Sequence, residues 1–263
     1  IPASRIYSDA GIPMISGSVT SPSFTQQGYR NTFRLIANDQ QQGEALAKYA
    51  VGKLGAKRVA VIDDRTTYGQ GLADDFAKAV EQAGGKVVKR EFTTNSATDF
   101  MAVLTSIKGE KPDLLFYGGM DAQAGPMVKQ MGKLGIKAAF MGADGVNTPE
   151  FAKLGGGSAE GAYASSAGLP KEKLPGYADF NQKFKQQFQT EIQAYAPYNY
   201  DAAKVLIAAM KRAGSADPAK YLPEVAKTDY QGVTGPVKFD AKGDIQQATV
   251  SLYQLKQGKW VGL

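Results

Sequence analysis

The residues best suited to chemistry in this chain stand where short apolar runs end. Tyr68 follows the run "VAVI" that begins at Val59, Met120 and Asp121 follow "LLFYGG", and Asp144 follows "AAFMGA". Glycines accompany each of these sets, and glycine lets a ligand approach the backbone closely. The pattern predicts a cleft wall that offers an aromatic face, an apolar group and a carboxylate. Asp144, between small residues, could equally cap a turn.

Two residue types are missing, and their absence excludes whole classes of site. The chain has no cysteine and no histidine, so disulfides, thiolate nucleophiles and Cys-ligated metals are excluded. Ser-His-Asp and Cys-His catalysis are excluded as well. Hydrolysis by paired carboxylates or a lysine base remains open on these grounds, but we expect no enzyme, no metal and no cofactor. The net charge is +6, but the basic residues are scattered among acidic ones, so we expect no nucleic-acid partner.

The glycine-rich stretch "YGQGLAD" (from Tyr68) contains the beginning of a dinucleotide-binding motif. Asp74 stands where the third glycine of that motif would be. Asp74 and Asp75 would also repel a pyrophosphate at the start of a helix. Two interpretations remain open. Gly69 and Gly71 simply make a strand-to-helix turn, or the stretch presents Tyr68 to a ligand at the carboxyl end of a parallel strand.

Strands and helices alternate clearly from residue 58 to residue 146. Strands are expected over "RVAVIDD", "KVVKREF", "DLLFYGG" and "AAFMGADG", with helices between them. The helix "GLADDFAKAVEQAG" places Leu72, Phe76, Ala79 and Val80 on one face. Repeated β-α-β units with short links predict an α/β fold with a parallel, doubly wound sheet.

The segments outside this block are organised differently. One further strand, "GIPMIS", and one further helix, "QQQGEALAKYAVGKLG", precede it. After it come three helices in succession, a hairpin-like segment "GPVKFDAKGD", and an alternating strand "ATVSLYQLKQGKW" that ends at a turn. The late helices have few strands to pack on. Either they bundle, or part of their sheet is not in this chain.

Nothing in the sequence predicts insertion into a membrane. The 263 residues are enough for two lobes with real cores. No apolar run approaches the roughly 20 residues of a membrane-spanning helix. The beginning, "IPASRIYSDAG", lacks the pattern of a signal peptide, and a mature secreted form would lack it too.

Several stretches resemble one family, the periplasmic branched-chain amino-acid binding proteins, which are type I solute-binding proteins of ABC transporters. They are "IPASRIYSDAGIPMIS", "TQQGYRNTFRL", "DDRTTYGQGLADDF", "YGGMDAQAGPMVKQMGKLG", "FMGADGV" and "GPVKFDAKGD". Together they follow the family order along the chain. The resemblance implies two doubly wound lobes with parallel sheets, joined at a hinge of three crossover strands, that close on an amino acid without catalysis.

The resemblance also implies the boundaries of the lobes. Lobe one would comprise residues 1–38 and 168–247, and lobe two residues 39–167 and 248–263. Family members have a further N-terminal segment before the position that matches Ile1. We therefore expect lobe one to be incomplete, without its first strands and without one hydroxyl that binds the ligand carboxylate.

The resemblance assigns ligand-binding roles residue by residue. Ser18 and Thr20, in "ISGSVTSP", would hold the ligand carboxylate through hydroxyl and backbone N–H groups. Asp144 would bind the ammonium, and Tyr68 would contact the ligand from lobe two. Met120 stands where leucine-binding members often have tyrosine.

The late helices would contribute a further contact. Tyr195, in "AYAPYNYDAA", matches a position that faces the ligand side chain. Tyr198 and Asp201 are weaker candidates, for which a helix-surface or hinge role is an equal alternative.

The partners implied are an aliphatic α-amino acid and an inner-membrane ABC permease, with the mature protein acting as a monomer in the periplasm. A ligand-sensing module of a receptor with the same fold is an alternative function. A hydrolase or lyase that uses Asp63, Asp64 and Asp144 is a remote one.

Overall fold

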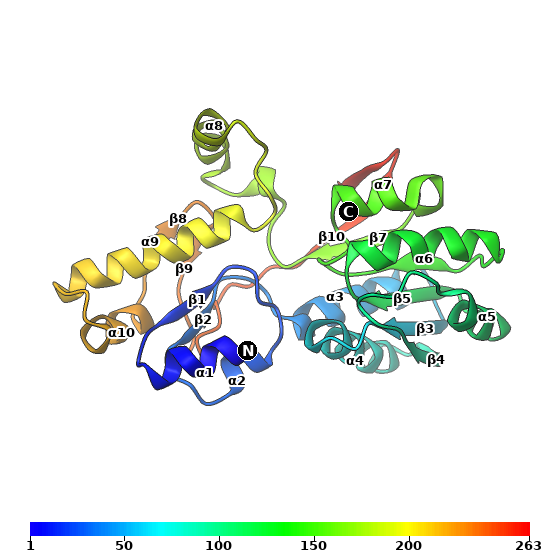
Figure 1. Cartoon of the computed structure of the whole chain (residues 1–263), viewed down its shortest axis with the longest axis horizontal. Coiled ribbons are helices and arrows are strands. Elements are labelled where there is room, and N and C mark those ends of the chain that lie inside the picture. The colour runs from blue at the N-terminus through cyan, green and yellow to red at the C-terminus, as the bar shows by residue number, and fades with distance from the viewer. The chain divides into compact units, whose positions relative to one another are not determined.

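The structure is a computed structural model that describes residues 1–263, and it divides into two compact units. The first unit comprises residues 1–38 and 168–249, and the second unit comprises residues 39–167 and 250–263 (Figure 1). None of the helices combines the length and the apolar character that crossing a bilayer requires.

The second unit is built on one seven-stranded sheet. Its strands are β3 (Arg58–Asp63), β4 (Lys86–Phe92), β5 (Leu114–Gly118), β6 (Ala139–Met141), β7 (Tyr163–Ser166), β10 (Ser251–Lys256) and β11 (Lys259–Gly262). The spatial order is β11-β10-β7-β6-β5-β3-β4. The strands from β3 to β7 pair in parallel, which confirms the parallel sheet predicted for β3 to β6. The C-terminal hairpin β10–β11 adds to β7 in the antiparallel direction.

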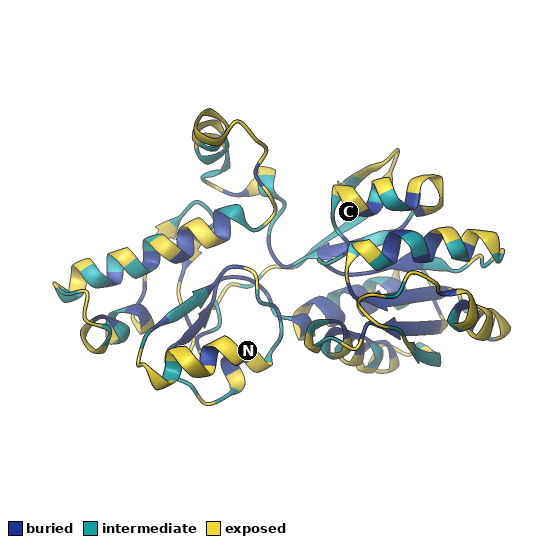
Figure 2. Cartoon of the chain, viewed as in Figure 1, coloured by how far each residue is buried: buried dark blue, intermediate teal, exposed yellow.

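Helices cover both faces of this sheet. On one face, α3 (Asp39–Gly52) and α4 (Thr67–Gln82) share a core with Val59 and Val61. On the other face, α5 (Met101–Gly109), α6 (Asp121–Lys133) and α7 (Pro149–Gly155) share a core with Ala60 and Ile62. A short 3₁₀ turn, Gly156–Ala159, follows α7. Alternate residues of the buried strand β3 thus feed opposite cores, and Figure 2 shows the buried strands between exposed outer helix faces.

The predicted face of α4 is confirmed. Leu72, Phe76, Ala79 and Val80 are all buried, and Phe76 stacks on Phe116 of β5 with ring centroids 3.9 Å apart. The C-terminal hairpin is also tied into this unit. Trp260, the only tryptophan of the chain, stacks on Phe151 and donates its indole N–H to the Thr148 carbonyl at 3.0 Å.

The first unit has much less sheet. Its elements are α1 (Pro2–Asp9), β1 (Met14–Ser16), α2 (Ser23–Gln26), β2 (Thr32–Arg34), a 3₁₀ turn (Lys171–Lys173), α8 (Tyr177–Phe188), α9 (Ala196–Ala213), α10 (Pro218–Ala226), β8 (Tyr230–Gly232) and β9 (Gly235–Val237). The strands β1 and β2 pair in parallel, and β8 pairs with β9 in the antiparallel direction. The predicted hairpin-like segment is confirmed, because Phe239 and Ile245 pair across the turn 240–244.

The late helices of the first unit are packed to different degrees. The buried faces of α9 and α10 share a core with Phe33 of β2, with Leu35 directly after it, and with Val237 of β9. By contrast, α8 buries none of its residues, and Figure 2 shows it teal and yellow throughout. The expected shortage of strands is therefore seen in the structure, where the first unit has only two-stranded sheets beside its three late helices.

Candidate functional site

The carboxylate of Asp144 is the centre of a polar network at the carboxyl ends of the strands of the second unit. Asp144 lies in the turn after β6 and is half-buried. Its Oδ1 accepts a hydrogen bond from the Tyr68 hydroxyl at 2.8 Å and another from the Gln42 side-chain amide at 2.9 Å. The Tyr68 hydroxyl in turn accepts from the backbone N–H of Gly145 at 3.0 Å. The structure thus brings together two of the predicted residues.

Gln42 belongs to this network, although no pattern in the sequence singles it out. It is 0% exposed on the buried face of α3. Its oxygen accepts from the hydroxyl of the buried Ser165, on β7, at 2.7 Å. One side chain therefore connects α3, β7 and the turn after β6. The available signal is its place on the helix face shared with Leu46, but neighbouring glutamines in "QQQ" hide it.

Glycine fixes the close approach of the strand-end turns. A Cβ at Gly145 would lie 2.7 Å from the Gly119 carbonyl oxygen, 2.9 Å from the Met120 sulfur and 3.0 Å from the Tyr68 hydroxyl. Met120 is the residue before α6 and is 46% exposed. The three predicted residues of this unit, Tyr68, Met120 and Asp144, are therefore neighbours.

The topology explains why these turns meet at this place. Starting from β3, the chain adds β4 on one side and β5 on the other, so the strand order reverses direction between β3 and β5. In open α/β sheets, ligands bind at the carboxyl ends of the strands at such a switch point. Tyr68 follows β3 and Met120 follows β5, so these two residues flank it.

The glycine-rich turn itself is structural. A Cβ at Gly69 would clash with the Asp64 carboxylate and with the Gly118 carbonyl, so α4 can begin close to β5 only with glycine there. Thr66 caps the helix by accepting from the Gly69 N–H at 2.9 Å. No further glycine of a dinucleotide cradle is present. The turn therefore delivers Tyr68 and is no phosphate cradle.

The other strand-end acids hold their own surroundings. Asp63 is buried and its Oδ2 pairs with Arg90 at 2.7 Å. Asp64 Oδ1 accepts from the N–H of Thr66 at 2.9 Å and from its hydroxyl at 2.6 Å. Asp121 accepts from the Thr148 hydroxyl at 2.6 Å. These contacts assign the three acids to local structure.

A buried phenol lies close to this edge of the sheet. Tyr117 is 0% exposed, and its hydroxyl has no hydrogen-bond partner. A Cβ at Gly119 would clash with this hydroxyl, so the two residues are packed tightly. Burial, followed by the nearby carboxylates of Asp64 and Asp63, raises the pKa of Tyr117 well above its ordinary value.

The predicted carboxylate-binding residues lie on loop 17–22 of the first unit, directly after β1. Ser18 is exposed and Thr20 is buried. The Ser16 hydroxyl turns back into the loop and accepts from the N–H groups of Ser18 at 3.2 Å and Val19 at 2.9 Å. A Cβ at Gly17 would lie 2.7 Å from the Tyr198 backbone, so the loop begins against α9.

The candidate residues at and in α9, Tyr195, Tyr198 and Asp201, differ in their burial and in their contacts. Tyr195 is the half-buried residue before the helix, and its carbonyl accepts from the Asn199 N–H at 3.0 Å. Tyr198 is buried against Gly168. Asp201 is 0% exposed and accepts from the N–H groups of Val233 and Thr234 at 2.9 and 2.8 Å. Asp201 therefore holds the turn between β8 and β9.

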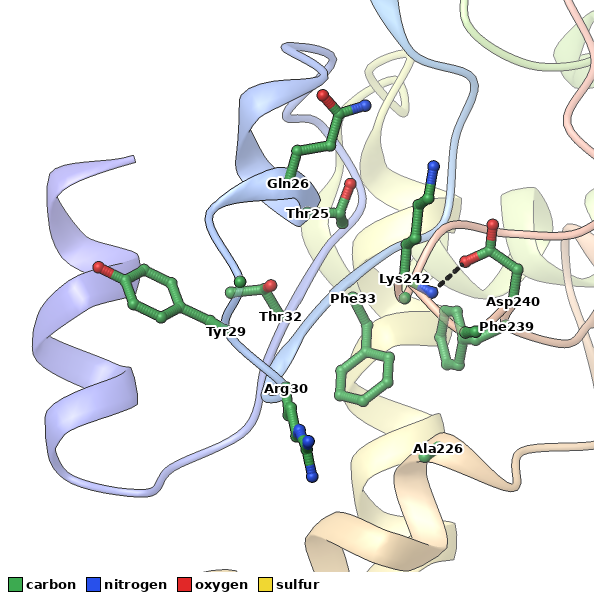
Figure 3. Close-up of a pocket in the computed structure, with 13 residues that line it drawn as sticks. Thr25, Gln26, Tyr29, Arg30, Thr32, Phe33, Ala226, Phe239, Asp240 and Lys242 are labelled. Atoms are coloured by element: carbon green, nitrogen blue, oxygen red, sulfur yellow. Dashed lines mark hydrogen bonds between the residues drawn. The ribbon is translucent and has the colours of Figure 1, made fainter.

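The first unit also contains a cavity of about 750 Å³ away from these residues (Figure 3). It is lined by Thr25, Gln26, Gly28, Tyr29, Arg30, Thr32, Phe33, Ala226, Phe239, Asp240, Ala241, Lys242 and Gly243. None of the predicted site residues lines it. Figure 3 shows Arg30 and Lys242 pointing in different directions, so the cavity does not gather charge at one point.

Comparison with known proteins gives consistent matches along the chain. Residues 2–259 match the family described as periplasmic binding protein. The Leu/Ile/Val-binding protein homolog 1 of Brucella suis biovar 1 (strain 1330) is 35% identical over 261 residues, which are 98% of this chain and 69% of the relative. An amino acid binding protein of Pseudomonas aeruginosa is 36% identical over 256 residues, 97% of this chain and 68% of the relative.

Solved structures with the same fold are also similar. A leucine binding protein from Thermotoga maritima has a TM-score of 0.91 at 30% identity, with 98% of this chain and 74% of that chain covered. A branched-chain amino acid transporter substrate binding protein from Streptococcus pneumoniae, in complex with isoleucine, has a TM-score of 0.81 at 27% identity, with the same coverage.

Proposed function

Since this chain belongs to the periplasmic binding protein family and has its type I fold, we propose that it binds an α-amino acid with an aliphatic side chain. Relatives named for leucine, isoleucine and valine support this ligand class. In this proposal the protein is no enzyme and needs no cofactor. It works as a monomer in the periplasm and delivers its ligand to an ABC permease of the inner membrane.

The observation that carries the proposal is the way in which Asp144 is held. The Tyr68 hydroxyl and the Gln42 amide both donate to one oxygen of the carboxylate. Both donors are neutral, so they orient the acid without neutralising its charge. A half-buried carboxylate of this kind suits the ammonium of an amino acid, because a charge-assisted hydrogen bond is strong where water is scarce.

The other parts of an amino acid have matching groups. Ser18 and Thr20 offer neutral donors for the carboxylate on loop 17–22, and neutral donors can hold an anion without a full counter-charge. Met120 and Tyr195 offer apolar contact to an aliphatic side chain. The proposal includes closure of the two units, because a ligand that engages groups of both binds the closed arrangement more tightly and shifts the equilibrium toward it.

A thermal-shift screen of the twenty amino acids tests the proposal. Leucine, isoleucine or valine should raise the melting temperature, since a ligand at 100 times its Kd stabilises by about 2.7 kcal/mol. Asp144→Asn keeps the shape of the side chain but removes its charge. It should abolish the shift and leave the melting temperature of the unliganded protein nearly unchanged.

Asp74→Asn is the matched control. Asp74 lies in the same unit and pairs with Arg90 with its side chain 62% exposed, and its neutral variant should keep the full ligand shift. A wild-type protein that responds to none of the amino acids contradicts the proposed ligand class. A full shift in Asp144→Asn contradicts the role of Asp144.

A further inference from the structure

We propose that Arg34 is the positioning residue of loop 17–22, and that it aims the N–H groups of Thr20 and Ser21 at the ligand carboxylate. The loop geometry stands by itself, while the identity of the ligand rests on the proposed function. Arg34 is the last residue of β2 and is 0% exposed. A charged side chain is buried this deeply only when its donors are satisfied.

The donors of Arg34 converge on the loop. Its Nη1 donates to the carbonyls of Val19, Thr20 and Ser21 at 3.4, 3.0 and 2.7 Å. Consecutive carbonyls therefore turn toward one cation. In a planar trans peptide, the C=O of one residue and the N–H of the next point in opposite directions.

This geometry decides which amides are left for a ligand. The carbonyls of Val19 and Thr20 face Arg34, so the N–H groups of Thr20 and Ser21 face away from it. Neither of these N–H groups has an acceptor within the structure, whereas those of Ser18 and Val19 are taken by the Ser16 hydroxyl. The carboxylate-binding amides are thus Thr20 and Ser21, and the part of Ser18 is confined to its hydroxyl.

Distant residues fix the guanidinium in turn. Asp244 Oδ1 accepts from Nε at 2.9 Å and from Nη2 at 2.7 Å. The Thr25 hydroxyl accepts from Nη2 at 2.8 Å and donates to the same Asp244 oxygen at 2.9 Å. The charge of Arg34 is therefore balanced inside the unit. Recognition of an anion at the loop then depends on how the amides are aimed, with little contribution from net charge.

A sharp turn brings Asp244 to this position. Gly243 has φ +91°, and a Cβ there would clash with the Thr32 carbonyl of β2. The Arg34 N–H donates to the Gly243 carbonyl at 2.8 Å. The stretches "TFRL" and "GPVKFDAKGD" thus together fix the conformation of loop 17–22, which precedes both in the sequence.

Arg34→Lys tests the proposal. Lysine keeps the positive charge and can pair with Asp244, but one ammonium cannot serve Asp244, Thr25 and the loop carbonyls together. Arg212→Lys is the matched control, because Arg212 lies in the same unit and also donates to a backbone carbonyl, that of Glu224 at 2.6 Å. Calorimetry would compare leucine with leucine amide, in which a neutral group replaces the carboxylate. Hydrogen exchange would follow the peptide that covers residues 17–25.

We expect Arg34→Lys to bind leucine about 30-fold more weakly and leucine amide within about threefold of wild type, since only the carboxylate uses the aimed amides. Exchange in 17–25 should accelerate about tenfold while exchange in α9 stays unchanged. Arg212→Lys should match wild type in every readout. Should Arg34→Lys fail to fold, Asp244→Asn is the second variant, with a loss of about fivefold for leucine alone.

Equal losses for leucine and leucine amide would overturn the proposal, because they would show a general structural role. Unchanged leucine affinity together with unchanged exchange in 17–25 would overturn it too. If the wild type binds no amino acid, the proposed function fails separately. The exchange of 17–25 then decides alone whether Arg34 sets the loop: acceleration supports the positioning role, and no change overturns it.

Discussion

Asp144 of the second unit is held differently from Arg34 and Asp201, two buried charged residues of the first unit. In the second unit, Asp144 is oriented by side chains, Tyr68 and Gln42, and stays half-buried. In the first unit, Arg34 and Asp201 are fully buried. Arg34 donates to three carbonyls of one loop, and Asp201 accepts from two backbone N–H groups of another. Arg34 and Asp201 therefore hold loops, whereas Asp144 is itself held by neighbouring side chains.

The amount of sheet accounts for the difference. The second unit has a seven-stranded sheet whose backbone ladder fixes the strand ends, and in our proposal Asp144, at one such end, binds the ligand ammonium. The first unit has two-stranded sheets only, and long loops must be held by other groups. Buried charges supply that order. Neutralising Asp201 in the first unit should thus cost stability, and neutralising Asp144 in the second unit should cost affinity.

The largest expected effect is on the stability of the first unit. The Asp201 carboxylate accepts from the N–H groups of Val233 and Thr234 and from the Thr234 hydroxyl. Asp201→Asn places an NH₂ group, itself a donor, against some of these donors. We expect the free energy of unfolding to fall by about 3 kcal/mol. Urea unfolding followed by far-UV circular dichroism measures it.

Asp144→Asn is the comparison variant for this measurement. In the unliganded protein it should change the free energy of unfolding by less than about 1 kcal/mol, because its carboxylate is half-buried and accepts from neutral groups. Equal destabilisation by the two asparagine variants would break the distinction between the units.

A smaller effect is expected at Gln42, on affinity. Gln42→Met keeps the volume but removes the amide that orients Asp144, so leucine should bind about tenfold more weakly. Gln40→Met is the control, since Gln40 lies on the same helix and bonds only the exposed Glu44. Calorimetry with both variants measures the loss. A Gln42→Met protein with wild-type affinity would show that Asp144 needs no support from α3.

The smallest effect is expected at Tyr117, whose buried hydroxyl has no partner. Tyr117→Phe removes an unsatisfied polar group and should stabilise the protein by up to about 1 kcal/mol at pH 7. Burial raises the folded-state pKa of Tyr117 above the unfolded value of about 10. Because the neutral phenol is favoured in the folded state, its contribution to folding stability is complete below pH about 10. This contribution is lost as the pH rises beyond that value.

Urea midpoints from pH 7 to pH 11 test this prediction. The wild type should lose stability more steeply than Tyr117→Phe above pH about 10. A clear destabilisation by Tyr117→Phe at pH 7 would mean that the hydroxyl is satisfied by a bonded group and would contradict the argument.

The sequence predicts the second unit better than the first for a physical reason. Continuous apolar runs such as "VAVI" and helical faces such as that of Leu72 and Phe76 are local patterns, and the structure confirms both. The strand β2 is missed, because it has three residues and ends in Arg34, a residue type that is mostly exposed. The short strand β7 is also missed, because neighbouring helices can mask so short a strand. The helices α1 and α7 are missed as well.

The candidate site is predictable only in part. Glycines beside strand ends indicate Tyr68, Met120 and Asp144, because topology alone brings such ends to one edge. Gln42 and Arg34 cannot be found this way. Gln42 meets Asp144 across 102 positions, and Arg34 meets Asp244 across 210. No local pattern records such a pairing.

The stacking of Trp260 on Phe151 has a practical consequence. The chain's one indole chromophore sits in the second unit, anchored to the Thr148 carbonyl. Its fluorescence emission therefore reports melting of that unit alone, whereas helical ellipticity sums over the whole chain. Where fluorescence and ellipticity diverge along a denaturant series, the difference between the two curves reports the unfolding of the first unit.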